Sequence, residues 1–439
     1  MENVVQNIWT NSKLLIKAGI ITAIVLLLQI PVFYVQNLIS EREARQKEAI
    51  AEVSSKWAGR QAITGPVLVI PYWQTANNGD SSQTKTRHLA YFLPDSLTVN
   101  AQITPQEKYR GIYKVMLYSS VIKLSSAFNG VQPQKLGIAP ADMIWSEASV
   151  RMGASDNKGL NDEVKLTVND TTLVVSPFEA DGANSGGLYA SLPLAPADEA
   201  KKVTFSSQIS VNGSEQLLFT PIGKSTTVNL ASAWPHPSFT GASLPQTTVI
   251  KDSGFTATWR SAGHKQSFPQ QWKDDAFSLG ASTGSLASAA FGVDLFVPVS
   301  GYQKTMRSIK YSFLCLLLTF AAFFVIETTA KKSAHPFHYG LIGLALVLFY
   351  TLLLSFSEYI GFNPAYVIAS LATIGLIGWF AKGILASGRL AVLVATILIL
   401  LYGYVFTILQ LQDYSLLLGS VGLFITLGVI MHFSKKIQW

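Results

Sequence analysis

Long apolar runs occupy both ends of the chain, and a polar segment of ordinary composition lies between them. An α-helix needs about 20 apolar residues to cross a hydrocarbon core of roughly 30 Å. The pattern predicts an α-helical membrane region of six spans, one before the polar segment and five in residues 301–439. The six runs are Leu14–Leu38, Tyr311–Ile326, Tyr339–Phe356, Pro364–Phe380, Leu390–Leu409 and Tyr414–Phe433.

The first run could instead be a signal peptide, because Lys13 and Lys17 stand at its start. A signal peptide has an apolar core of about 7–15 residues and ends at a small-residue cleavage site. This run is longer, and the sequence QIPVFYVQNLIS in it offers no small-x-small pattern. We therefore interpret residues 1–38 as a cytoplasmic tail and an uncleaved first anchor.

The polar segment, residues 39–300, predicts a large β-rich exported domain that begins with a helix. The run EREARQKEAIAEVSSKW, residues 41–57, contains strong helix formers and no Gly or Pro. Beyond it, segments such as GPVLVIPYW, EVKLTVN and KVTFSSQISVNG favour strands and are separated by turn residues. At least nine such segments predict mostly antiparallel, sandwich-like sheets. The small and polar stretch Gly182–Ala200 is interpreted as a long loop or linker.

The charges indicate an orientation in the membrane. Residues 39–300 hold 22 basic and 22 acidic residues, whereas residues 301–439 hold nine basic against three acidic. Cytoplasmic loops next to spans carry an excess of Lys and Arg, and the short loops near Glu358 and Asp413 carry neither. The pattern predicts that both termini are cytoplasmic and that residues 39–300 lie outside. Membrane orientation then accounts for the net positive charge of the chain, and we expect no nucleic-acid partner.

Cysteine and histidine usage predicts no disulfide, metal site or cofactor. Cys315 is the single cysteine and lies in an apolar run. His335 and His338 are three residues apart, but Pro336 lies between them and no further ligand type accompanies them. The chain also lacks the G-x-S-x-G, H-E-x-x-H and G-x-x-x-x-G-K-[ST] motifs. We therefore expect no catalytic residue and no enzymatic activity.

The stretch AWPHPSFTG, residues 233–241, is a candidate recognition turn with Trp234, His236 and Phe239. The prolines on both sides of His236 fix φ and restrict the preceding residues, so the histidine is held on a rigid, extended turn. Such a turn can present a recognition surface, or it can simply be a structural corner at the end of a strand. The structural corner is the interpretation that the absent catalytic partners favour.

Glu358, in SFSEYIGF, is a carboxylate between two apolar runs and could serve proton transfer, catalysis or anchoring. With a rise of about 1.5 Å per residue from Tyr339, it lies roughly 28 Å along the third span. That depth predicts the outer membrane interface, with Arg307 or Lys310 as the partner. By the same arithmetic the inner interface holds a second acidic and basic group, formed by Glu327, Lys331 and Lys332.

Several stretches resemble the CreD family of bacterial inner-membrane proteins, in register over nearly the whole chain. They include ITGPVLVIPY, LLFTPIGKSTTVNLASAWPHPSFTGASLP, YQKTMRSIKYSFLCLLLTFAAFFVIE and HPFHYGLIGLALVLFYTLLLSFSEYIGFNPAYVIASLA. In the family pattern a histidine often follows the carboxylate of the last stretch, whereas this chain has Tyr359. The resemblance implies a cell-envelope integrity protein linked to a two-component stress response, colicin tolerance and β-lactam response. It implies no catalytic residues, cofactor or substrate.

The sequence thus favours a non-enzymatic membrane protein that supports envelope integrity and the response to envelope stress. Its expected partners are the lipid bilayer and either other envelope proteins or further copies of the chain. A transporter or channel for a lipid or envelope component is the alternative, although it would need polar groups at the membrane midplane. A membrane-associated hydrolase or transferase is the third, and would need convergent carboxylates or histidines.

Overall fold

The computed structural model of the chain describes most of its length. The described residues are 16–77, 83–161, 164–179, 186–277, 279, 284–295, 301–330, 332, 334–411 and a few positions between 417 and 431. The chain divides into two compact units. The membrane unit is Met1–Lys47 with Val299–Trp439, and the β unit is Glu48–Pro298.

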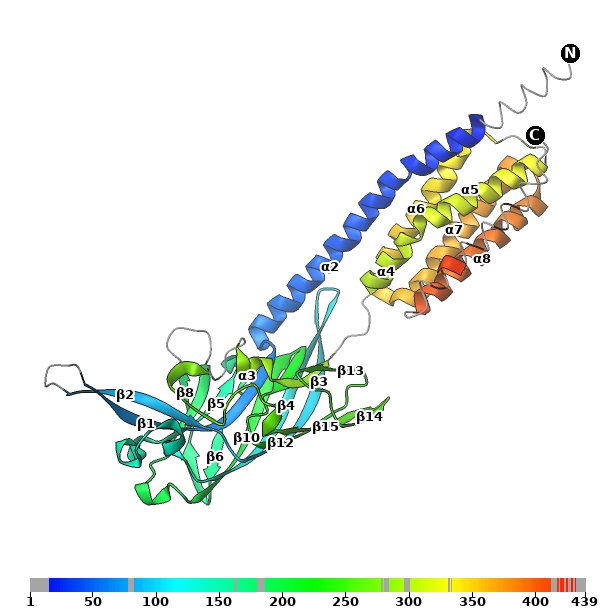
Figure 1. Cartoon of the computed structure of the whole chain (residues 1–439). Coiled ribbons are helices and arrows are strands. Elements are labelled where there is room, and N and C mark those ends of the chain that lie inside the picture. The colour runs from blue at the N-terminus through cyan, green and yellow to red at the C-terminus, as the bar shows by residue number, and fades with distance from the viewer. Residues whose placement is uncertain are drawn as a thin grey trace, which may run out of the picture. The chain divides into compact units, whose positions relative to one another are not determined.

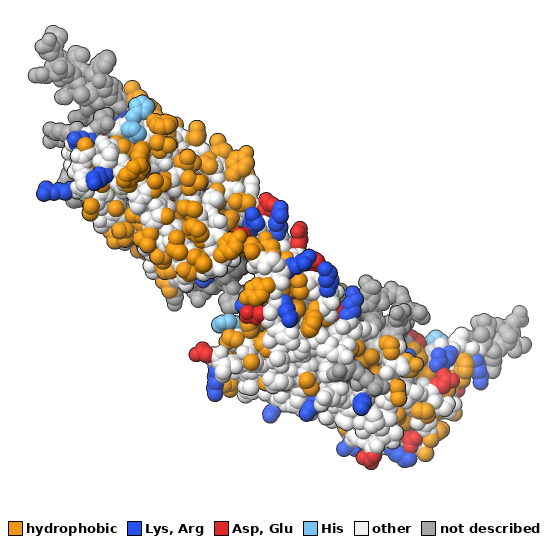
Figure 2. Space-filling view, turned by 180° about the vertical axis from the view of Figure 1, so that it is seen from behind, with side chains coloured by type: hydrophobic (Ala, Val, Ile, Leu, Met, Phe, Trp, Pro, Cys, Tyr) orange, Lys and Arg blue, Asp and Glu red, His pale blue; other side chains and the backbone are white. Residues whose placement is uncertain are grey.

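The membrane unit is built of apolar helices that lie side by side (Figure 1). Among the described residues, five helices are long and apolar enough to cross a membrane. Most of the predicted sixth span, Tyr414–Phe433, lies outside the described residues, so the count of six stays a prediction. Hydrophobic side chains cover much of the surface of this unit, as expected for contact with lipid (Figure 2). The helices are Ile16–Trp57, with α2 (Gln29–Trp57) as its longer part, α4 (Gly301–Lys310), α5 (Ser312–Thr329), α6 (Pro336–Ile360), α7 (Phe362–Leu385) and α8 (Gly388–Gln410).

The first helix extends from the apolar segment to Trp57, which confirms the predicted helical extension beyond residue 40. A local irregularity at Leu28 precedes Pro31. Proline has no N–H to donate, so the regular hydrogen bond to the preceding turn is lost there. The helix regains its regular pattern at once, since the Val32 N–H donates to the Leu28 carbonyl at 3.3 Å.

The β unit contains two sheets that are mostly antiparallel. Two pairings are parallel: β1 with β11 in the first sheet, and β12 with β3 in the second. In the first sheet the order is β13 (Pro237–Gly241), β17 (Phe291–Leu295), β11 (Gln216–Phe219), β1 (Gln61–Asn77), β5 (Ser149–Ala154), β9 (Gly186–Ser191) and β8 (Ser176–Glu179), with β2 (Gln83–Phe92) between β1 and β16 (Gln271–Lys273). In the second it is β14 (Thr247–Lys251), β15 (Gly254–Ala262), β12 (Ser225–Ser232), β3 (Ser96–Arg110), β4 (Tyr113–Asn129), β10 (Lys202–Ser214), β6 (Lys165–Val168) and β7 (Thr171–Val174).

Alternating burial along the strands produces a shared core. On β10, for example, Val203, Phe205, Ser207 and Ile209 are buried, and the residues that alternate with them are exposed. One hydrophobic cluster contains Leu217 and Phe219 of the first sheet together with residues of the second. A short helix, α3 (Ser285–Ser288), adds the buried Leu286 to this cluster.

The stretch Gly182–Ala200 contains a strand, so its interpretation as a loop or linker was wrong over part of its length. Its described residues include β9, which pairs with both β5 and β8. Leu188 and Ala190 of β9 are buried, because every second side chain points into the core. The small residues around them obscured this short alternation.

Candidate functional site

One face of the first helix packs into the membrane unit along its whole apolar length. The buried positions recur every three or four residues, as on a helix that packs along a single seam. Leu28 meets α6 at Gly343, where a Cβ would collide with the Leu28 side chain and lie 2.8 Å from Phe320 of α5. The seam consists of Ile21, Val25, Leu28, Val32, Val35 and Ile39.

At the start of this seam lies the Lys17 cluster, formed by Lys17, Glu327, Ala334 and Tyr339. Glu327 is 4% exposed, and its carboxylate accepts hydrogen bonds from the Lys17 ammonium, the Ala334 N–H at 2.7 Å and the Tyr339 hydroxyl at 2.7 Å. Lys17 also donates to the Ala334 carbonyl at 2.7 Å. A buried carboxylate is tolerated when it is paired and hydrogen-bonded. Here the ion pair and hydrogen bonds of Glu327 connect the first helix to the end of α5 and the start of α6.

At the other end of the seam lies the Arg42 cluster, formed by Arg42, Tyr302 and Glu358. The Arg42 Nε atom lies 3.9 Å from the Glu358 Oε1 atom, and the Tyr302 hydroxyl donates to the same oxygen at 3.0 Å. The Glu358 side chain is 10% exposed and that of Arg42 is 41% exposed. This cluster joins α2 to the start of α4 and the end of α6.

The separation of the two clusters fits the two interfaces of a bilayer. Lys17 and Arg42 are 25 residues apart on one helix, which is about 38 Å at 1.5 Å per residue. A hydrocarbon core is about 30 Å thick, or roughly 40–45 Å with its polar regions. The two clusters are therefore about as far apart as the two interfaces of a bilayer, and the depth of Glu358 in the membrane stays a prediction.

The expected partners of Glu358 differ from those in the structure. Among the described residues, neither Arg307 nor Lys310 forms an ion pair with Glu358, whose cation is Arg42. On α4 it is Tyr302, with the buried Thr305 and Ile309, that faces inward, whereas Lys310 is exposed. Depth along one helix does not specify which side of that helix faces which neighbour, so it could not point to a cation on the first helix.

The expected inner group is also only partly as predicted. Glu327 is paired, but its cation is Lys17 of the first helix. Lys332 is exposed and contributes its backbone N–H, which donates to the Glu327 carbonyl at 3.1 Å. Lys331 lies outside the described residues. Nearby, the His335 side chain caps α6 by accepting from the Phe337 N–H at 3.2 Å, consistent with an interfacial histidine.

The candidate recognition turn is anchored in the core of the β unit. Trp234 is 8% exposed, and its indole N–H donates to the His236 carbonyl at 3.0 Å. Phe239 packs edge-on against Phe255 and Trp259, with ring centroids 5.7 and 5.6 Å apart. Of these three side chains, only that of His236 is exposed. Two of the three residues thus hold the corner in place, and a recognition surface would rest on the histidine alone.

A hydrogen-bond chain on the β unit was missed by sequence reasoning. The His88 Nδ1 atom lies 3.0 Å from Asp274 Oδ1, and its Nε2 atom lies 3.0 Å from the Thr86 hydroxyl oxygen. Asp274 is 186 residues from His88 in sequence and has a φ of +53°. No local sequence pattern therefore predicts that these two side chains meet. The Thr86 hydroxyl also reaches the Gln74 carbonyl at 3.3 Å.

These features define a class of protein: a multi-pass membrane protein with a large β-rich domain between its first span and its remaining spans. The chain belongs to the CreD family. The family model described as "Inner membrane protein CreD" matches residues 13–439. The inner membrane protein CreD of Escherichia coli strain K12 is 32% identical over 419 residues, which cover 94% of this chain and 91% of that protein. The chain is accordingly a multi-pass protein of the inner membrane.

Proposed function

We propose that this protein is a non-enzymatic membrane protein that supports cell-envelope integrity and the response to envelope stress. The observation that carries the proposal is that the buried carboxylates of the membrane unit pair with other helices of the same unit. Glu327 and Glu358, the carboxylates in the described part of residues 299–439, are both engaged by side chains of the first helix. Groups that serve transport or catalysis must meet a substrate or a proton path. Here they hold helices together.

The proposal extends to topology and assembly. Six spans with both termini in the cytoplasm would place the β unit, with sandwich-like sheets, outside the cytoplasm. The bilayer would be its permanent partner, and other envelope proteins or further copies of the chain its protein partners. Reporter domains fused after Gly182 and after Trp439 should report opposite compartments, and the same compartment for both would contradict this topology.

A transporter would need polar groups that are open to a path near the midplane. Buried tyrosines of the membrane unit instead pack among aromatic rings, such as Tyr366 and Tyr402 beside Phe349. The Tyr366 hydroxyl is occupied, because it donates to the Tyr402 carbonyl at 2.8 Å. This packing supports a closed, structural core and favours the integrity proposal over the transport one.

A second candidate, a hydrolase, rests on the Thr86–His88–Asp274 chain. Its order of contacts is that of a hydroxyl nucleophile, a base and an orienting acid. Against it, Thr86 also contacts a backbone carbonyl, and the cavity between the last turns of α2 and strands β3 and β4 is lined by other residues. The arrangement is also consistent with a strand-to-turn contact between β2 and the residues after β16.

Survival of cells under envelope stress separates these candidates. In a host that lacks its own copy, Asp274→Asn and His236→Ala should restore survival in detergent and in a β-lactam as well as the natural chain does. Lys17→Met should fail to restore it. Full loss of protection by a stably produced Asp274→Asn protein would favour the hydrolase. Full protection by Lys17→Met would contradict the proposal that the protein acts through helices held together by buried charge.

A further inference from the structure

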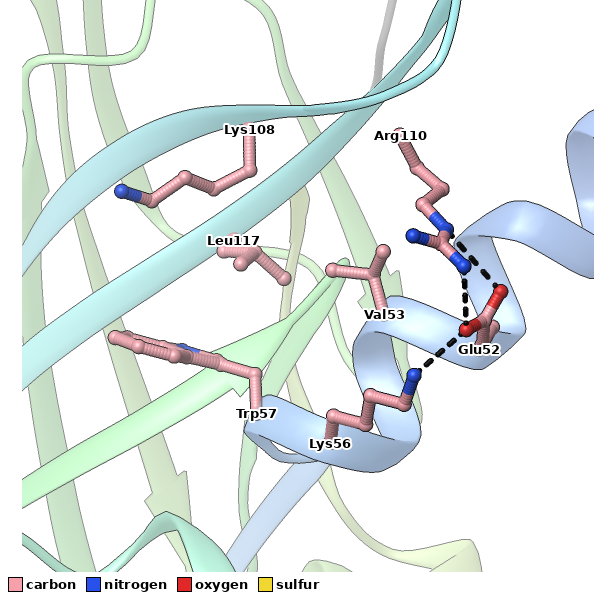
Figure 3. A pocket seen from close by; sticks show the side chains of 7 residues that line it. All are labelled: Glu52, Val53, Lys56, Trp57, Lys108, Arg110 and Leu117. Atoms are coloured by element: carbon pink, nitrogen blue, oxygen red, sulfur yellow. Dashed lines mark hydrogen bonds and ion pairs between the residues drawn. The ribbon is translucent and has the colours of Figure 1, made fainter.

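A cavity of about 290 Å³ lies in the β unit, between the last turns of α2 and the paired strands β3 and β4 (Figure 3). Its size is at the lower end of the range for small-molecule sites, enough for a headgroup or a short chain. The residues that line it are Glu52, Val53, Lys56, Trp57, Lys108, Arg110 and Leu117.

One side of this cavity is apolar. Val53 and Trp57 come from one face of α2, and Leu117 is supplied by β4. In Figure 3 the Trp57 ring lies below Lys108, with Leu117 between them and Val53 beside Leu117. An aromatic ring with two aliphatic side chains offers a surface for hydrocarbon and for the non-polar part of an amphiphile.

The rim of the cavity is basic. Lys56 donates to Glu52 at 2.6 Å, and Arg110 approaches the same carboxylate at 3.0 Å. Hydrogen bonding from Lys56 and the charge of Arg110 lower the pKa of Glu52, so its negative charge persists. The lining of the cavity therefore contains three basic side chains and one acidic side chain. Among the described residues, Lys108 has no anion within ion-pair distance.

The end of the β3–β4 hairpin next to the cavity is amphipathic as well. Tyr109 is 66% exposed and Ile112 is 38% exposed, although both are large and hydrophobic. They alternate with Lys108, Arg110 and Lys114. Aromatic and aliphatic side chains beside basic ones are typical of surfaces that contact the headgroup region of a bilayer.

We propose that this cavity binds the headgroup of an anionic phospholipid. Lys108, Arg110 and Lys56 would contact the phosphate, and Trp57 with Val53 and Leu117 would contact the glycerol and the first methylenes. The combination selects lipid over a free anion, since free phosphate would leave the apolar side unused. An acidic peptide would leave the exposed tyrosine and isoleucine of the hairpin unexplained. The inference goes beyond the proposed function and does not depend on it.

The test uses the full-length chain in zwitterionic nanodiscs, titrated calorimetrically with dihexanoyl phosphatidylglycerol below its micelle concentration. Saturable binding should be seen with this probe and should be much weaker with dihexanoyl phosphatidylcholine. Glycerol 3-phosphate should bind more weakly than the phosphatidylglycerol. Equal binding of glycerol 3-phosphate would overturn the proposal in favour of a phosphate site, and equal binding of phosphatidylcholine would overturn the role of charge.

Variants locate the site. Lys108→Gln should weaken binding about five-fold, the effect expected for one basic residue near an anionic lipid surface. Lys123→Gln, an exposed lysine on β4 away from the cavity, is the matched control and should leave the affinity unchanged. Trp57→Ala should also weaken binding, and circular dichroism must show that it is folded. If Lys108→Gln and Lys123→Gln behave alike, or if a folded Trp57→Ala binds normally, the cavity is not the site.

Discussion

Arg42 and Glu358, which are 316 positions apart in the sequence, lie with Arg42 Nε and Glu358 Oε1 3.9 Å from each other at one end of the first helix's seam. Lys17 and Glu327 form the corresponding pair at the other end. In both clusters a tyrosine hydroxyl donates to the same carboxylate, at 3.0 Å from Tyr302 and 2.7 Å from Tyr339. The apolar seam supplies contact area, and the two ion pairs fix the position of the helix along it.

Glu327→Gln should strongly destabilise the membrane unit. Removal of one partner from a buried ion pair leaves the other charge uncompensated and costs about 3–5 kcal/mol. Glu41→Gln is the control, because Glu41 forms an exposed pair with Arg45, for which about 0–1 kcal/mol is expected. Thermal unfolding of the detergent-solubilised chain measures both. Equal transition temperatures for the two variants would show that the Lys17 cluster does not hold the fold.

Gly343→Val should loosen the first helix from the bundle. Any Cβ at this position collides with Leu28 and crowds Phe320, and overpacking of this kind costs about 1–3 kcal/mol. Gly340→Val is the matched control, since a Cβ there has nothing within 4 Å. Limited proteolysis after residue 40 should be faster for Gly343→Val only. Unchanged cleavage in both variants would place the first helix elsewhere.

Binding of phosphatidylglycerol should be insensitive to pH between 7 and 5. The pKa of Glu52 is lowered in the folded chain by Lys56 and Arg110. The stability contributed by ionised Glu52 is therefore present above its unfolded pKa, and it is lost only as the pH falls through the lowered, folded pKa. The cavity lining includes no histidine. Below the ordinary carboxyl range, protonation of Glu52 should increase the affinity.

The comparison variant for that titration is Glu52→Gln. It should bind the lipid more tightly than the natural chain wherever Glu52 is ionised and should lack the rise at low pH. A rise between pH 7 and 5 in the natural chain would mean that Glu52 titrates in its ordinary range, contrary to the contacts with Lys56 and Arg110.

Much of the fold can be predicted from hydrophobic patterning alone. Apolar run length is a local property, so Pro336–Ile360 and Gly388–Gln410 were identified to within a few residues at each end. The helical extension to Trp57 was equally readable, because no Gly or Pro interrupts it. The parallel pairs of β1 with β11 and β12 with β3 could not be read, since strand order depends on contacts far apart in sequence.

The candidate sites show the same limit. The depth of Glu358 follows from counting residues along one helix, and the prediction of an interfacial group rests on that count. Its partner Arg42 depends on how two helices are rotated toward each other, which hydrophobicity does not specify. His88 and Asp274, which are 186 positions apart, meet for a similar reason, because β16 pairs with β2.

The most direct test of the account is disulfide cross-linking of the first helix to α6 in native membranes. In a Cys315→Ser background, Arg42→Cys combined with Glu358→Cys should cross-link readily under mild oxidation. The pairs Arg307→Cys with Glu358→Cys and Lys310→Cys with Glu358→Cys serve as comparisons and should cross-link poorly. Efficient cross-linking of either comparison pair, with none between positions 42 and 358, would contradict the seam and its two ion pairs.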